Sequence, residues 1–159
     1  AEAETEQDFL EIRAELRDAG YLRQARDKRE MKRSTGPREF CTTTGYKVLV
    51  GRNNRQNDVL TLKNADHRDL WLHTQKIHGS HVILCTGGCI PDEDTIVEAA
   101  KIAAYYSQAR ESGNVPVDYT LVKNVKKPAG GRPGMVIYPT YQTVNVTPEE
   151  ELVRRLQIR

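Results

Sequence analysis

The feature that most constrains the fold is a helical stretch with small side chains on one face, from about residue 95 to 110. Its apolar residues recur at three- and four-residue spacing, which is typical of an amphipathic helix. Thr95 and Glu98 fit a capping box at its start, and residues 111–114 contain the signal that ends it. The buried face is expected to consist of Ile96, Ala99, Ala100, Ala103 and Ala104. Such small residues allow a helix to lie close against a sheet.

Short apolar stretches on both sides of this helix predict strands. The strands are expected at residues 46–50, 58–63, 69–74, 81–86, 117–122, 134–138 and 143–146. Pro148 is expected at the first position of a short C-terminal helix whose apolar face contains Leu152 and Leu156. This order predicts an α+β fold, with a mixed β-sheet and the long helix packed on one of its faces.

The N-terminal residues 1–39 are expected to be separate from a folded domain at 40–159. Residues 7–19 have the spacing of an amphipathic helix, which either packs on the domain or forms the end of a longer coiled coil. The charge-rich residues 22–39 are interpreted as a solvated linker, with a phosphate-contacting arm as the alternative. Because the chain opens in an acidic stretch without a methionine, we expect it to be part of a longer protein.

Composition narrows the classes of function. The chain has 159 residues and a net charge of +2, so any nucleic-acid binding must come from local basic patches. Its three cysteines, Cys41, Cys85 and Cys89, are interpreted as thiols in a reducing compartment, which predicts a cytoplasmic protein. No apolar run approaches the roughly 18 residues of a membrane span, so no membrane partner is expected.

Residues 51–82 contain the single Trp and all four His of the chain. The His and Cys spacings match neither CxxC nor HExxH, so no metal or cofactor is expected. Neither a GxSxG motif nor a recognisable nucleophile and base is present, so the domain is not expected to be an enzyme.

Two polar segments favour a binding function instead. The loop from Arg52 to Asn57 is rich in side-chain amides, which can read base edges, although asparagines also simply close turns. The loop 123–134 has four cations and no acid, so it suits phosphate groups, with a solvated hairpin tip as the alternative.

Six segments in sequence resemble the NFACT-R domain, the C-terminal module of the fibronectin-binding protein A and RqcH family. They are GRNNRQND, DLWLHT, GSHV, EAAKIAAYYSQAR, PVDYT and KKPAGGRPGMVIY. The resemblance covers about Phe40 to Pro148, and residues 7–19 are similar to the end of the family's coiled-coil region.

The resemblance implies an RNA-binding module of a ribosome-associated quality control factor, which helps to tail stalled nascent chains. The implied partners are tRNA, the large ribosomal subunit and the remaining domains of the same full-length protein. A fibronectin-binding adhesin domain, exposed at the cell surface, is the alternative that the family offers.

The expected nucleic-acid-binding residues form a polar signature surface and a basic edge. The signature surface consists of Arg52, Asn53, Asn54, Asn57, Asp69, Trp71, His73, Ser80 and His81. The basic edge consists of Lys126, Lys127 and Arg132. Trp71 and Arg52 are expected to stack on or clamp RNA, while a buried Trp71 is the alternative. We expect the fold to bring the surface and the edge together.

Overall fold

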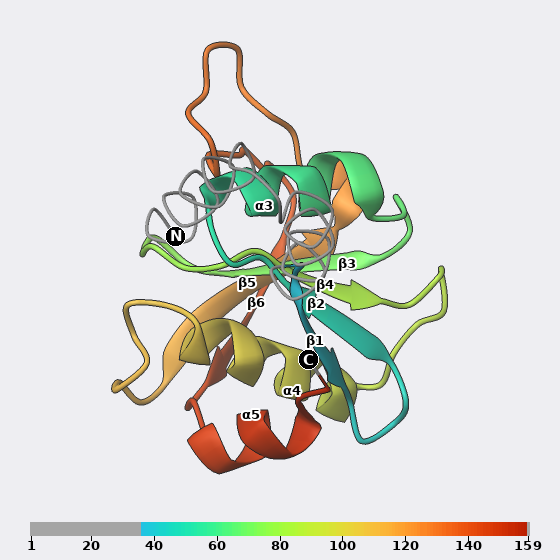
Figure 1. Cartoon of the computed structure of the whole chain (residues 1–159), viewed down its shortest axis with the longest axis vertical. Helices are drawn as coiled ribbons and strands as arrows, with labels where there is room; N and C mark the ends of the chain where they lie inside the picture. Colours follow the sequence, from blue (N-terminus) through green and yellow to red (C-terminus); the bar gives the residue numbers. More distant parts are fainter. Residues whose placement is uncertain (1–35, 159) are drawn as a thin grey trace, which may run out of the picture. The chain divides into compact units, whose positions relative to one another are not determined.

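The structure, a computed structural model, describes residues 36–158. The predicted helix at 7–19 and most of the charged linker lie outside the described residues. Pro37–Arg159 form one compact unit, built around a six-stranded sheet (Figure 1). The strands are β1 (Arg38–Cys41), β2 (Lys47–Val50), β3 (Leu70–Thr74), β4 (Val82–Cys85), β5 (Val115–Leu121) and β6 (Gln142–Val146). Their order across the sheet is β1-β2-β4-β3-β5-β6.

The sheet is antiparallel throughout, so the prediction of a mixed sheet was wrong. The α+β class was correct. The long helix joins β4 to β5, and such a strand–helix–strand connection usually joins parallel neighbours. Here β3 lies between the two strands and pairs antiparallel with both of them. The sequence predicted this strand at 69–74, but it contains no local signal for its position between β4 and β5.

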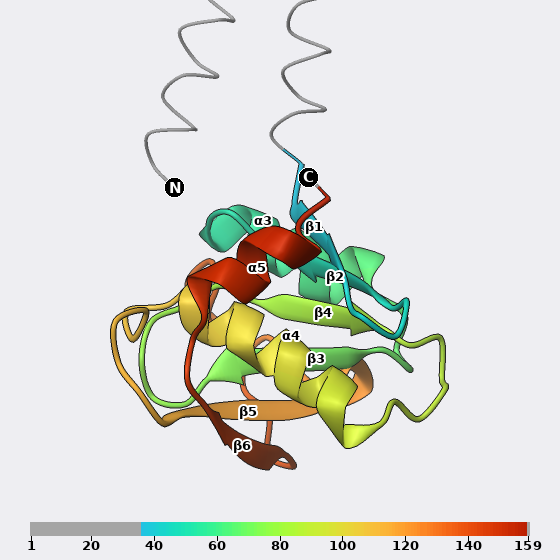
Figure 2. The ribbon, with the colours of Figure 1, turned by 90° about the horizontal axis from the view of Figure 1, so that it is seen from below.

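One face of the sheet is covered by α4 (Glu93–Tyr105) and α5 (Glu150–Leu156), as Figure 2 shows. The predicted alanine stripe of α4 is buried and packs against Leu72, Val82 and Val117 of the sheet. The helix begins after Asp92, whose side chain accepts the backbone N–H of Thr95, so the cap lies three residues before the predicted one.

The opposite face carries α3 (Asn54–Asp58) and a π-helix, η2 (Val59–Asn64). The predicted strand at 58–63 was therefore wrong. Asn53 caps α3 by accepting the N–H of Gln56, and the chain stays helical beyond it. Val59 and Leu62 are exposed, so the apolar residues here do not form the buried face that a strand would need.

The segment after η3 (Val122–Asn124) returns across this second face before β6 begins. Its central part protrudes beyond α3 as an orange loop in Figure 1. The predicted strand at 134–138 was also wrong, because only a single bridge forms there, between Lys126 and Ile137. Beneath it lies a second core that contains Leu60, Trp71 and Ile83.

The remaining differences concern the ends of elements. β1 begins at Arg38, so the folded part starts two residues before the predicted boundary at 40. Pro148 lies before α5, not at its first position. Within residues 36–158, no helix is both long and apolar enough to cross a membrane.

Candidate nucleic-acid interface

The carboxylate of Asp58 anchors the basic loop to the helical segment on the second face. Its Oδ1 accepts the backbone N–H of Gly134 at 3.0 Å, and its Oδ2 lies 3.0 Å from Lys127 Nζ. Lys127 also donates to the carbonyl of Arg132. The fold therefore brings the basic edge to the asparagine-rich segment, as expected from the sequence.

At Gly134 the basic loop lies directly against the asparagine-rich segment. Its φ of +84° lies in the left-handed region, and a Cβ there would lie 2.7 Å from Asn54 Oδ1. Its carbonyl oxygen accepts a hydrogen bond from His81 Nε2 at 3.1 Å. Only glycine combines this backbone conformation with such contact distances.

His81 is a buried structural residue, with 1% of its surface exposed. Because Nε2 faces a carbonyl, it must carry the proton, and Nδ1 then accepts from the Thr61 hydroxyl at 3.0 Å. Burial lowers the pKa of His81 to about 3, so the ring is neutral. Asn57, also buried, accepts the backbone N–H of His81 at 3.2 Å. Both residues position the loop and do not contact solvent.

His73 has an unusual pair of acceptors. Its Nδ1 lies 2.7 Å from the carbonyl oxygen of Thr74 and its Nε2 lies 3.2 Å from that of Gly79. A neutral imidazole has one N–H, so only one nitrogen can donate at a time. Burial lowers the pKa of His73, although both carbonyls act in the opposite direction. The ring stacks on Trp71, with 5.6 Å between centroids.

Three further signature residues are structural, not exposed. Trp71 has 0% exposure, so its ring offers no open face for stacking, and the predicted stacking role is corrected. Asp69 is buried and accepts the backbone N–H of Gly87 at 2.9 Å, at the opposite end of β3 from His73. Asn53 caps α3. The turn-closing alternative was right for Asn53.

The remaining predicted residues are exposed or half-buried. They are Arg52, Asn54, His73, Ser80, Lys126, Lys127 and Arg132. A cavity of about 580 Å³ between the basic loop and β3 is lined by Asn54, His73 and Arg132, among others. Among residues 36–158, the side chains of Lys126 and Arg132 form no ion pair with a carboxylate.

A tyrosine and arginine cluster beside this cavity was missed by sequence reasoning. The Arg110 guanidinium lies 4.2 Å from the ring centroid of Tyr105, and that of Arg38 lies 5.0 Å from Tyr106. The backbone N–H of Ser80 donates to the Tyr106 carbonyl at 3.0 Å, which joins the cluster to the signature surface. The sequence signal that could have indicated this cluster is the pair of adjacent tyrosines at the end of the helix, followed by an arginine.

Comparison with known proteins identifies the family. The family model described as the NFACT protein RNA binding domain matches residues 37–138. The chain belongs to the NFACT RNA-binding domain family. Among its relatives is the Rqc2 homolog RqcH of Bacillus subtilis, 47% identical over 94% of this chain and 26% of the relative. The corresponding protein of Streptococcus suis is 41% identical over 93% of this chain and 27% of the relative.

A solved structure also resembles this chain. It is described as the C-terminal of the fibronectin/fibrinogen-binding protein from Streptococcus suis, with a TM-score of 0.74 and 41% sequence identity. The match covers 77% of this chain and 50% of that one. The chain spans about a quarter of the length of the curated relatives that it matches.

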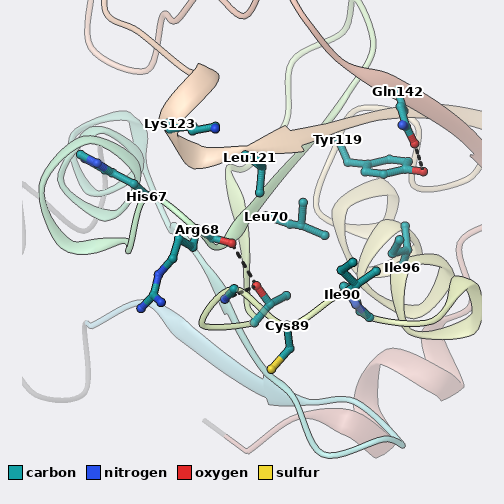
Figure 3. A pocket seen from close by; sticks show the side chains of 13 residues that line it. His67, Arg68, Leu70, Cys89, Ile90, Ile96, Tyr119, Leu121, Lys123 and Gln142 are labelled. Atoms are coloured by element: carbon teal, nitrogen blue, oxygen red, sulfur yellow. Dashed lines mark hydrogen bonds between the residues drawn. The ribbon is translucent and has the colours of Figure 1, made fainter.

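The NFACT-R domain has a further cavity at the other end of the sheet, with a volume of about 470 Å³ (Figure 3). Leu70, Ile96 and Leu121 contribute apolar side chains to it, and none of the predicted site residues lines it. In its wall, the Tyr119 hydroxyl donates to Gln142 at 2.7 Å. We treat this cavity as separate from the candidate interface.

The thiols and acids of the NFACT-R domain show no catalytic or metal-binding grouping. All three cysteines are free, and burial raises the pKa of the Cys85 thiol to about 11. That thiol stays protonated at neutral pH and is a poor nucleophile. Within residues 36–158 no three His, Cys, Asp or Glu side chains lie close enough to hold a metal ion.

Proposed function

We propose that this NFACT-R domain binds RNA through the end of the sheet where the basic loop meets the tyrosine and arginine cluster. The observation that carries the proposal is the set of cations without carboxylate partners among the described residues. Arg38 and Arg110 belong to the tyrosine and arginine cluster. Arg132 lines the cavity of about 580 Å³ beside it, and Lys126 belongs to the basic loop, where its backbone pairs with Ile137. Such cations are available to phosphates, and their binding releases counterions.

The chemistry of the surface suits RNA better than a small anion. Arginine planes and tyrosine rings provide stacking faces beside the cations, which is how proteins hold unpaired nucleotides. The amide of Asn54 and the hydroxyl of Ser80 add donors and acceptors beside them. Asn54 is exposed and lines the cavity, and Ser80 is half-buried.

The more specific proposal is a role in ribosome-associated quality control, in the cytoplasm. The curated relatives are named RqcH, and we infer that the RNA is tRNA or ribosomal RNA of the large subunit. The domain would then help a longer protein to tail stalled nascent chains. Two measurements distinguish these RNA partners. One is the retention of the purified chain on large ribosomal subunits, and the other is its binding to free tRNA.

A pair of charge-reversal variants tests RNA binding. Lys126→Glu with Arg132→Glu is expected to weaken binding of a fluorescent single-stranded RNA at least tenfold in 100 mM salt. The control pair is Lys47→Glu with Arg155→Glu, which changes the net charge equally on other parts of the surface. Lys47 and Arg155 are exposed, and exposed ion pairs such as that of Lys47 with Glu39 contribute little. Equal effects of both pairs would contradict a localised interface.

Fibronectin binding is a second candidate, because the similar solved structure comes from a fibronectin/fibrinogen-binding protein. Binding of the chain to immobilised fibronectin, before and after treatment with RNase, tests it directly. Binding that survives RNase and the charge-reversal pair would favour the adhesin alternative. Loss of binding on RNase treatment would show that RNA bridges the two proteins.

A further inference from the structure

Trp71 has a polar atom without a partner. Its Nε1 is the one buried side-chain nitrogen or oxygen, among residues 36–158, that has no hydrogen-bond partner. Buried donors are nearly always paired, so an exception calls for a reason. This exception lies on β3, where the strand faces the returning segment 134–138.

A cavity adjoins Trp71. It has a volume of about 250 Å³, and its wall includes Trp71, His73, His81 and Tyr138. The Trp71 ring lies 4.7 Å from Tyr138 and 5.4 Å from His81, measured between centroids. The volume lies below the roughly 300–1,000 Å³ of pockets for drug-sized ligands, so it suits one planar group.

Two other buried donors of this wall are already bonded. His81 Nε2 donates to the Gly134 carbonyl, and the Tyr138 hydroxyl donates to Asp118 at 2.8 Å. Trp71 Nε1 is thus a buried donor on this wall that still lacks an acceptor. An aliphatic side chain has no such acceptor, whereas every nucleobase has at least one on its edge.

Positive charge lies at the rim. Lys76 is exposed and lines this cavity, while Arg132 lines the adjoining cavity of about 580 Å³. Neither cation has a carboxylate partner within the part of the chain that the structure describes. A nucleotide whose base entered the cavity would thus have cations near its flanking phosphates.

Met135 is an exposed side chain of this wall. It lines both cavities and 52% of its surface is exposed. Because Trp71 has no exposed surface, a base reaches its N–H only after a lining side chain moves. An unbranched, mostly exposed methionine can change rotamer with little loss of packing.

We propose that this cavity takes a single unpaired RNA base, whose edge accepts a hydrogen bond from Trp71 Nε1 after Met135 moves aside. The inference rests on the RNA-binding function proposed above and makes it more specific: the domain prefers single-stranded RNA. Trp71 thus acts through its N–H edge and not through the open stacking face expected from the sequence.

The single Trp of the chain makes the test direct, since a ¹⁵N-labelled sample has one indole N–H resonance. The probes are a single-stranded uridine decamer and a ten-base-pair RNA duplex. The indole resonance is expected to shift on addition of the single strand and to stay in place with the duplex. Trp71→Phe keeps an aromatic ring without the donor, and is expected to lower the single-strand preference by roughly 3- to 10-fold.

The outcomes separate this inference from the proposed function. If the single strand binds and the indole resonance does not move, or if both RNAs shift it equally, the base-binding cavity is overturned while RNA binding stands. If neither RNA binds, the RNA-binding function itself fails, and this inference fails with it. The wild-type resonance decides the matter even if Trp71→Phe does not fold.

Discussion

At the scale of single residues, the polar side chains on the second face of this domain divide into two groups by burial. Asn57, Thr61 and His81 are buried and bonded to one another or to the backbone. Asn54 and Arg132 are exposed beside them. Sequence reasoning could identify both groups as polar and clustered. It could not tell which of them are buried, because the buried Asn57 and the exposed Asn54 lie in the same polar segment of the sequence.

The buried His81 predicts a pH dependence of stability. Its pKa is lowered from 6.5 to about 3 by burial, so between these values the unfolded chain binds a proton that the native chain does not. The free energy of unfolding should therefore fall as the pH drops below 6.5, by up to about 1.4 kcal/mol per pH unit. The lowered pKa of His73 acts in the same direction.

Urea unfolding from pH 7 to pH 4.5 measures this dependence. In His81→Gln the slope of stability against pH is expected to be shallower than in the wild type, although the variant is less stable at pH 7. His67→Gln is the control, because His67 is exposed and its removal should leave the slope unchanged. An unchanged slope in His81→Gln would show that this histidine is not neutral in the native state.

At the scale of elements, the hydrophobic pattern correctly predicted most strands of the sheet and the long helix that packs on it. It did not predict the two segments that cover the second face. The small-residue face of α4 and the strands β2 to β6 have regular periods, and the structure confirmed them apart from their ends. The segments 58–63 and 134–138 were wrongly predicted as strands. Their backbones are held by side chains distant in sequence, Asp58 to Gly134 above all. The hydrophobic pattern of a short segment cannot indicate such partners, because they lie far away in the sequence.

The Asp58 anchor predicts the stability of the basic loop. Asp58→Ala removes the acceptor of the Gly134 N–H and the partner of Lys127. Hydrogen bonds to charged groups contribute about 1.5–3 kcal/mol, and a loss within this range is expected in urea unfolding. The matched control is Asp66→Ala, whose partner Arg68 is exposed, and which should destabilise the domain clearly less than Asp58→Ala.

Hydrogen exchange locates the effect of Asp58→Ala. Amide protons of residues 126–137 should exchange faster in this variant, while those of α4 should keep their wild-type order of protection. Uniform acceleration across the domain would mean that Asp58 stabilises the whole fold and has no special role in holding the loop.

At the scale of the whole domain, the cations of the proposed interface come from three separate parts of the chain. Arg38 is the first residue of β1, Arg110 follows α4, and Lys126 and Arg132 belong to the basic loop. Sequence reasoning found the loop by its charge density. It considered Arg38 only as part of the charge-rich residues 22–39, with a phosphate-contacting arm as the alternative. It did not find Arg110, because a single arginine in a charge-rich chain has no signal until the fold places it beside Tyr105 and Tyr106.

This arrangement predicts the salt dependence of RNA binding by the whole domain. If the four cations each neutralise one phosphate of a single strand, the slope of log K against log salt should be about −3. Lys126→Gln with Arg132→Gln, and separately Arg38→Gln with Arg110→Gln, should each reduce that slope by roughly half. Lys47→Gln with Arg155→Gln is the control and should leave it unchanged. A wild-type slope in the Arg38 and Arg110 variant would confine the interface to the basic loop, because the tyrosine and arginine cluster would then make no phosphate contact.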